Sequence, residues 1–146
     1  MKFTLNIDPG AQEELVLTMH SGGKFAEEIE NLVFSYNGDD LLFVFGEDEV
    51  SRLKFEDIEC VTVIDRKVFA VDTSGKKWRI RERLYELESR LPQYFVRINK
   101  STIANQNKIE HFKTTIGGSV DAIFKCGFTD YISRRCLPNL KRRIFK

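Results

Sequence analysis

The 146-residue sequence has few of the features that mark secreted or membrane-spanning proteins. Its three cysteines, Cys60, Cys126 and Cys136, are odd in number and widely spaced, which favours free thiols in a reducing compartment over a disulfide framework. Its longest apolar runs, such as Leu41–Phe45, are about one strand long, whereas a membrane-spanning helix needs roughly 20 apolar residues. The N-terminus has no apolar stretch of the secretory type. These absences predict a cytoplasmic protein.

The residue patterns typical of enzymes and cofactor sites are also absent. The segment from Ser21 to Lys24 lacks the leading glycine and the final Ser/Thr of a phosphate-binding loop. The two histidines, His20 and His111, have no ligand partner at metal spacing. No His-plus-carboxylate pattern accompanies the cysteines, which are expected to be ordinary thiols. We therefore expect no catalytic site, no metal, no cofactor and no small-molecule substrate.

The composition is that of a folded domain, since 42% of the residues are hydrophobic. The formal net charge of +1 conceals a strong polarity along the chain: residues 1–60 carry −10 and residues 61–146 carry +11. The basic half has the charge of a nucleic-acid-binding surface. Alternatively, the two halves form a solvated surface on which the charges neutralise each other.

Residues 1–40 are predicted to form a small acidic ββα unit. Alternating apolar residues predict strands at 2–8 and 15–19, with a turn at Pro9 and Gly10 between them. Apolar residues at helical spacing then predict one amphipathic helix that ends at Gly38; they are Phe25, Ile29, Leu32, Val33 and Tyr36. The unit is too short to bury a core alone, so it must pack on the following residues or on another subunit.

Residues 41–146 are predicted to form a second, mainly β domain. Short segments with strand patterns recur at regular spacing; they are 41–45, 49–55, 58–64, 67–73, 77–81, 94–98, 108–113, 119–125 and 128–133. Leucines from Leu84 to Leu91, followed by Pro92, predict one helix, and Pro138 begins a second with Leu140 facing inward. The predicted fold class is therefore mainly β (α+β), with short antiparallel sheets and one or two helices after the ββα unit.

Three basic clusters lie where predicted strands end, within 65–67, 95–105 and 132–143. In order and spacing, these clusters and their neighbours resemble the LytTR-type DNA-binding domain, the output module of many bacterial response regulators. The matching segments are Asp57–Val61, Asp65–Val68, Arg83–Leu91, Phe95–Asn105 and Ser133–Lys141. The sequence departs from the family pattern at Asn99, where histidine is common, and at Cys136, where an aromatic residue is common.

The resemblance implies a transcriptional regulator that binds tandem direct repeats in double-stranded DNA, with basic loops reaching successive grooves. Carried onto this sequence, the DNA-binding residues are Arg66, Lys67, Asn99, Lys100, Ser101, Arg134 and Arg135. Arg66, Arg135 and Lys100 are the expected base contacts, and the others are expected to contact phosphate or position the loops. Arg97 fits either a DNA contact or a structural ion pair, and Asn105 is expected to close a turn.

The N-terminal unit is too short to be a receiver domain, and its acidic charge disfavours contact with DNA. A stand-alone family member without phosphoacceptor control is therefore expected. We expect a homodimer, and because stand-alone members often associate with small membrane proteins, a membrane partner that sequesters the protein is a further expectation. The alternative is a protein–protein interaction module that pairs its acidic and basic halves and binds no nucleic acid. If Arg66, Lys100 and Arg135 share one face, DNA binding is favoured.

Overall fold

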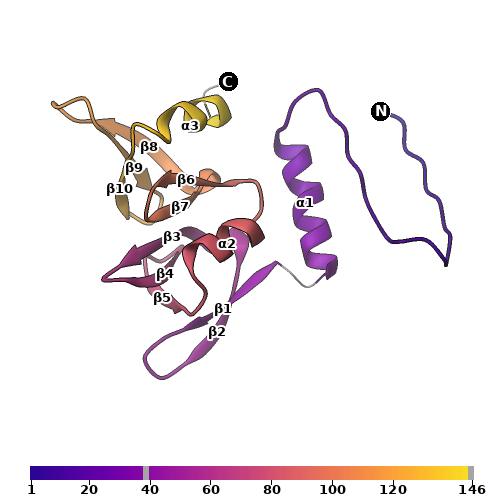
Figure 1. The fold of residues 1–146 in the computed structure, drawn as a ribbon, viewed down its shortest axis with the longest axis horizontal. Helices are drawn as coiled ribbons and strands as arrows, with labels where there is room; N and C mark the ends of the chain where they lie inside the picture. The colour runs from indigo at the N-terminus through magenta and orange to yellow at the C-terminus, as the bar shows by residue number, and fades with distance from the viewer. Residues whose placement is uncertain (38–39, 145–146) are drawn as a thin grey trace.

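The computed structural model describes residues 1–37 and 40–144. The described residues form two antiparallel sheets, with three helices around them (Figure 1). The larger sheet has the strand order β2-β1-β5-β4-β3-β7-β6, and the smaller has the order β10-β9-β8. This architecture confirms the predicted mainly β fold class.

The larger sheet is built from the first seven strands of the chain, and the smaller sheet from the last three. The larger sheet comprises β1 (Leu41–Phe45), β2 (Val50–Lys54), β3 (Ile58–Ile64), β4 (Lys67–Asp72), β5 (Lys77–Ile80), β6 (Phe95–Asn99) and β7 (Thr102–Asn105). The smaller sheet comprises β8 (Ile109–Thr114), β9 (Val120–Phe124) and β10 (Thr129–Ile132). The helices are α1 (Lys24–Asn37), α2 (Leu84–Arg90) and α3 (Leu137–Ile144), and none of the helices in the described residues is long and apolar enough to cross a membrane.

Strand β3 lies at the centre of the core because both of its faces are covered. Val61 packs in a cluster with Phe55, Trp78 and Leu87, where α2 closes one side of the sheet. Cys60, its neighbour on the opposite face, packs in a second cluster that includes residues of the smaller sheet and α3. A strand buried on both faces needs a nearly continuous apolar run, which the sequence of β3 supplies.

The predicted strands and helices of residues 41–144 agree closely with the structure. All nine predicted strands form, each with bounds within one residue of the prediction, and α2 and α3 occupy the two predicted helical segments. Strand β7 was not predicted, because its residues were interpreted as a polar loop. The polar residues at its ends, Thr102 and Asn105, are buried with hydrogen-bond partners, so the usual apolar–polar alternation is absent.

The predicted N-terminal strands do not form. Residues 1–23, which we call the N-terminal arm, contain no strand, and all of them are exposed. A strand is stable only when its backbone finds a ladder partner and its apolar side chains find a surface to cover; the arm has neither among the described residues. The predicted helix forms as α1, whereas its predicted end at Gly38 lies outside the described residues.

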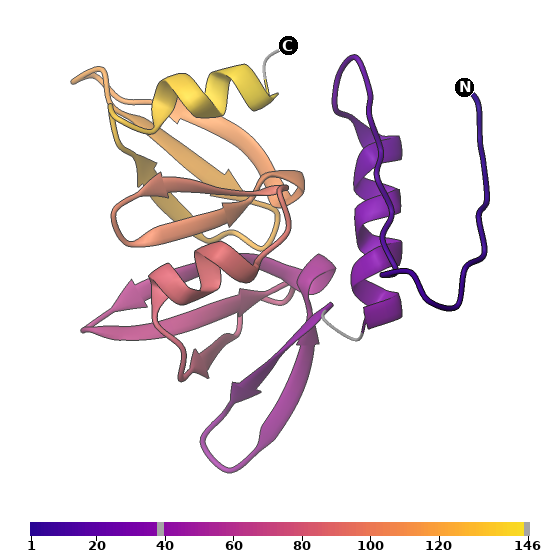
Figure 2. The same ribbon diagram turned by 45° about the vertical axis from the view of Figure 1, so that its right-hand side comes forward.

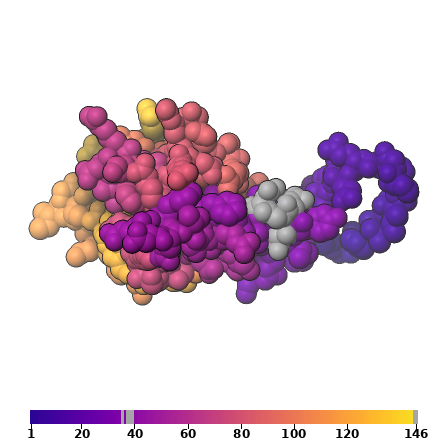
Figure 3. All heavy atoms as spheres, turned by 90° about the horizontal axis from the view of Figure 1, so that it is seen from below, coloured from indigo at the N-terminus to yellow at the C-terminus, as the bar shows by residue number. Residues whose placement is uncertain are grey.

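Helix α1 stands beside the sheets, and the arm loops away from the body of the molecule (Figures 2 and 3). The ring of Phe34 packs edge-on against Phe55, with 5.9 Å between ring centroids. The Oε1 atom of Glu30 accepts a hydrogen bond from the Gln93 backbone N–H at 2.8 Å. Helix α1 is therefore attached to the β domain by a small number of contacts.

Candidate nucleic-acid interface

The first basic turn joins β3 to β4 through only two residues, Asp65 and Arg66. Both have positive φ angles, 50° and 66°. A two-residue hairpin whose residues both have positive φ is a tight turn that matches the twist of the flanking strands. Arg66 and Lys67 are exposed, and neither side chain has a hydrogen bond or ion pair among the described residues.

The second basic turn, Lys100 and Ser101, joins β6 to β7. The Ser101 carbonyl accepts a hydrogen bond from the Val63 N–H at 2.9 Å, which continues the pairing of Thr62 with Thr102 beyond the end of β7. Because β3 and β7 are antiparallel neighbours, this bond places the second turn at the same end of the sheet as the first. The Lys100 side chain is exposed there.

The third basic turn leads from β10 into α3. The Ser133 N–H donates to the Ile98 carbonyl at 2.8 Å, which fastens the turn to β6 one residue before Asn99. The Ser133 carbonyl accepts from the N–H groups of Cys136 and Leu137, so the chain closes directly into the helix. Between these fixed points, Arg134 and Arg135 are exposed, and neither side chain has a partner among the described residues.

The three basic turns lie on one side of the molecule, and α1 lies on the other. Figures 1 and 2, which differ by a 45° rotation, both show this arrangement. The turns that carry Arg66, Lys100 and Arg135 are thus brought together from segments far apart in the sequence. This is the arrangement that we expected of a DNA-binding surface.

Asn99 is the one predicted site residue that is not at the surface. Its side chain is fully buried, and its Nδ2 atom donates to the Tyr131 carbonyl at 2.8 Å and to the Asp130 carboxylate at 3.1 Å. Its Oδ1 atom accepts from the Ser101 N–H at 2.8 Å. A buried side chain with both ends bonded does not reach a phosphate in this conformation, so of the two roles expected for Asn99 the structure favours positioning of the loop. Its role is to hold the second turn.

A buried polar network that the sequence reading missed lies beneath the turns. The Asp130 carboxylate accepts from the Thr102 hydroxyl at 2.6 Å, and that hydroxyl also meets the Thr62 hydroxyl at 2.8 Å. With Asn99, these residues connect β3, β7, β6 and β10. Buried polar groups are costly unless they are bonded, so a satisfied network fixes one arrangement of its strands. A Thr and an Asp on separate strands gave no sequence signal of this pairing.

Two other arginines near the turns have defined surroundings. Arg97 forms an ion pair with Glu88 at 2.6 Å and donates to the Lys100 carbonyl at 2.8 Å, which favours the structural alternative for this residue. Arg81 follows β5 directly, and because Val68 pairs with Ile80, the register places Arg81 beside Lys67. Arg81 is exposed and was not predicted, because only the position of β5 in the sheet brings it to the first turn.

Elsewhere, two of the three cysteines lie in surroundings that suppress thiol ionisation. Burial raises the pKa of the Cys60 thiol well above its usual value, and burial also raises that of Cys126. A thiol with a raised pKa is a poor nucleophile at neutral pH.

Asn105 closes a turn as predicted: its Oδ1 accepts from the Asn107 N–H at 3.0 Å, and its Nδ2 donates to the Ile58 carbonyl. The described residues contain no group of three His, Cys, Asp or Glu residues placed to hold a metal ion.

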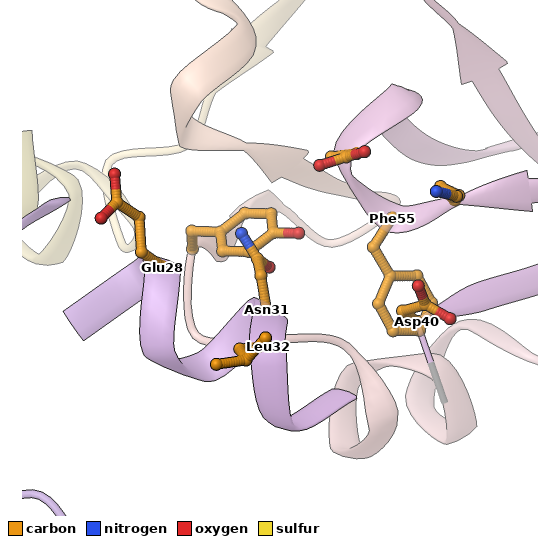
Figure 4. A pocket seen from close by; sticks show the side chains of 8 residues that line it. Glu28, Asn31, Leu32, Asp40 and Phe55 are labelled. Carbon is orange, nitrogen blue, oxygen red and sulfur yellow. The ribbon is translucent and has the colours of Figure 1, made fainter. Parts of the chain in front are cut away.

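One pocket lies between α1 and the β domain (Figure 4). Glu28 and Asn31 of α1 face Asp40 and Phe55 across it. Tyr94 also lines the pocket, and its buried hydroxyl has no hydrogen-bond partner in the described part of the chain. Burial, together with nearby carboxylates, raises the pKa of Tyr94 above its usual value, so the hydroxyl stays neutral. This acidic pocket is on the side of the molecule away from the basic turns.

Known proteins resemble this chain over most of its length. A family model described as the LytTr DNA-binding domain matches residues 48–145. An uncharacterized HTH-type transcriptional regulator from Staphylococcus aureus (strain NCTC 8325 / PS 47) is 31% identical over 147 residues, which cover 99% of this chain and 98% of the relative. A similar regulator from strain MSSA476 is 32% identical over 144 residues, covering 96% and 97%.

The fold is also found among solved structures. A LytTr DNA-binding domain from Bacillus cereus superposes with a TM-score of 0.64 at 17% identity, over 70% of this chain and 94% of that chain. That likeness confirms the fold, and the residues matched by the family model, 48–145, include all three basic turns. The chain therefore belongs to the LytTr DNA-binding domain family.

Proposed function

We propose that this protein is a transcriptional regulator that binds double-stranded DNA through its three basic turns, with two copies on tandem direct repeats. The observation that carries the proposal is the placement of three exposed basic turns on one side of the molecule, above a buried network that connects their strands. The names of the Staphylococcus aureus relatives support the regulatory part of the proposal.

The turns, rather than a helix, are the proposed reading elements. Arg66 and Arg135 can each donate two parallel hydrogen bonds to the O6 and N7 atoms of guanine, and Lys100 can donate to the same acceptors. Lys67, Ser101 and Arg134 are the proposed phosphate contacts, and Arg81 joins them at the first turn. No two helices of the described residues are joined by a short turn, which favours this mode over a helix-turn-helix.

The test is fluorescence anisotropy with a duplex that holds two tandem half-sites and with a scrambled duplex, each across a salt series. We expect tighter binding to the tandem duplex, with log K falling by about 0.9 per phosphate contact for each log unit of salt. Arg135→Ala should lose about 1–3 kcal/mol of binding, mainly on the tandem duplex.

The matched control is Arg52→Ala, which removes an exposed arginine from the middle of edge strand β2, away from the turns. Its affinity for both duplexes should stay close to that of the unaltered protein. Equal or undetectable binding to both duplexes at low salt would contradict the proposal. It would favour a protein–protein interaction module instead.

A further inference from the structure

Helix α1 leaves part of its apolar face uncovered: Ile29 and Val33 are half-buried, whereas three other apolar side chains are exposed. Phe25, Leu32 and Tyr36 lie along one stripe of the helix, and 45%, 65% and 77% of their surfaces are exposed. The opposite side of the helix, which includes Glu30 and Phe34, makes the contacts with the β domain. An amphipathic helix normally buries its apolar face, so this orientation leaves a surface in need of a partner.

The N-terminal arm adds further exposed apolar side chains. Phe3 and Ile7, which alternate with polar residues, are 83% and 84% exposed, and Val16 is 78% exposed. The turn between the two segments has already formed, since the Ala11 N–H donates to the Asp8 carbonyl at 3.1 Å. The arm thus has two strand-patterned segments joined by a turn, but no ladder partner among the described residues.

The exposed apolar area is that of an interface. Eleven large hydrophobic side chains between Met1 and Tyr36 are exposed. Their exposed fractions range from 37% to 93%, so at on the order of 150 Å² for a fully exposed large side chain they present roughly 1,000 Å² of apolar surface per chain. A permanent homodimer buries about 1,000 Å² or more on each subunit. The arm and α1 together therefore provide the area that one such dimer requires.

The charge of this surface disfavours anionic partners, and its strand pattern favours a second copy of the chain. Residues 1–37 carry a net charge of −4, which disfavours both DNA and an anionic membrane surface. One arm and one helix are too small for a stable core, but two copies supply four strand segments and two helices, enough for a two-layer αβ unit. A two-fold dimer also uses the same surface on both subunits, so no second kind of surface is needed.

We propose that the arm and the apolar face of α1 form a dimerisation unit, in which residues 2–8 and 15–19 of two copies of this chain pair into one sheet covered by the two α1 helices. The ββα arrangement expected from the sequence then forms only between subunits. The dimer holds the two DNA-binding faces outside the dimer unit. This inference does not depend on DNA binding.

The first test is the mass of the full-length protein in solution, measured by light scattering and sedimentation velocity between about 1 and 100 μM. We expect twice the chain mass of 17.0 kDa. Leu5→Asp buries a charge in the proposed sheet and should weaken dimerisation at least about 100-fold. Asn6→Asp adds the same charge on the opposite strand face and should remain a dimer. A monomeric unaltered protein, or two variants that behave alike, would overturn the proposal.

Salt distinguishes this dimer from pairing of the acidic and basic halves. Two acidic units repel each other, so raising the salt concentration from 0.05 to 0.5 M should preserve or strengthen the dimer. Dissociation at high salt would overturn the proposal. Hydrogen exchange gives an independent measurement: amides in 3–7 and 15–19 should be protected in the unaltered protein and exchange freely in Leu5→Asp.

The DNA experiment separates this inference from the proposed function. A dimer that binds neither duplex would contradict the proposed function and leave the dimerisation unit in place. A Leu5→Asp monomer that keeps its circular dichroism spectrum and melting temperature shows that the β domain remains folded, because the arm lies outside the core. A monomer that has lost its fold would overturn the assignment of the arm as a separate unit.

Discussion

Arg66 occupies a backbone conformation that only glycine adopts without cost. Its φ of 66° and that of Asp65, 50°, lie in the left-handed region, where a side chain costs about 1–2 kcal/mol. Such strain persists where a side chain is needed for another purpose. In the proposed function, that purpose for Arg66 is contact with DNA.

This conformation predicts that stability and DNA binding change in opposite directions. Arg66→Gly should leave the free energy of unfolding unchanged or raise it by up to about 1 kcal/mol, while DNA affinity falls at least about tenfold. Asp65→Gly is the matched control: it relaxes the same turn but removes no cation, so affinity should not fall. Urea unfolding and anisotropy measure the two effects. Equal losses of affinity in both variants would assign the effect to turn shape.

Asn99, unlike the exposed Arg66, is expected to contribute to stability, since it is buried and supports the second turn. Asn99→Ala leaves the Asp130 carboxylate with one donor fewer and frees the Ser101 N–H. We expect a loss of about 1–3 kcal/mol in the free energy of unfolding, measured by urea titration. Asn107→Ala removes an exposed amide and should change stability by less than about 0.5 kcal/mol. A stable Asn99→Ala variant would show that the network does not hold the strands.

At the scale of elements, the β4–β5 hairpin depends on one carboxylate at its turn. The Oδ1 atom of Asp72 accepts from the Ser74 and Lys76 N–H groups at 2.9 and 3.0 Å, and Oδ2 accepts from the Trp78 indole at 2.9 Å. Partial burial raises the pKa of Asp72, but hydrogen bonds from Ser74, Trp78 and Lys76 outweigh it, and the net pKa is lowered from 3.8.

This lowered pKa predicts a stability change in acid. The folded state holds the Asp72 carboxylate ionised more firmly than the unfolded state does, so its contribution is complete above about pH 4 and decreases as the pH falls through the lowered folded pKa. Asp72→Ala should cost about 1–2 kcal/mol at pH 7 and less at pH 2.5. Denaturant titrations at both pH values measure the difference. The same loss at both would assign the effect to packing.

The elements that the sequence predicted well share one property: each strand is paired within its own chain. The run of β3 and the leucines of α2 fix those elements because burial follows directly from their periodicity. The arm alternates as clearly but remains unpaired, because a pattern does not say whether its partner lies in the same chain. Strand β7 is paired but was not predicted, because its buried polar residues Thr102 and Asn105 are of types that are common in loops.

At the scale of the whole molecule, the opposite charges of the two chain halves become a separation in space. The acidic helix α1 and the basic turns lie on opposite sides (Figure 1). The screening length at 0.15 M salt is about 8 Å, so carboxylates on α1 have little effect on the turns. The sequence revealed the charge difference between the halves, but only the folded chain shows which surface each half occupies.

This separation predicts a position-dependent effect of removing one charge. Glu28→Gln on α1 should change DNA affinity by less than about twofold at 0.15 M salt. Arg134→Gln at the third turn, which also removes one charge, should lower affinity about threefold or more and reduce the slope of log K against log salt by about 0.9. Anisotropy over the salt series measures both. Equal effects would mean that net charge alone governs binding.

The site could be predicted only in part, for reasons that particular residues illustrate. The family resemblance placed Arg66, Lys100 and Arg135 on turns, and all three are exposed there, because turn residues stay exposed whatever packs beneath them. It left open whether Asn99 contacts phosphate or positions the loop, since the residue type alone does not distinguish an exposed amide from a buried one. Arg81 was absent because its neighbour, Lys67, lies 14 positions earlier and meets it only through the β4–β5 register.

The shortness of the basic turns has a consequence for how the sequence of such a regulator diverges during evolution. The first two turns have two residues each, and their exposed cations contribute nothing to either hydrophobic core. Arg66, Lys100 or Arg135 can therefore be exchanged singly without loss of the fold, and in the proposed function each exchange would alter one part of the recognised operator. The network of Asn99, Thr102 and Asp130 has no such freedom. Target preference can diverge stepwise while the scaffold beneath it stays the same.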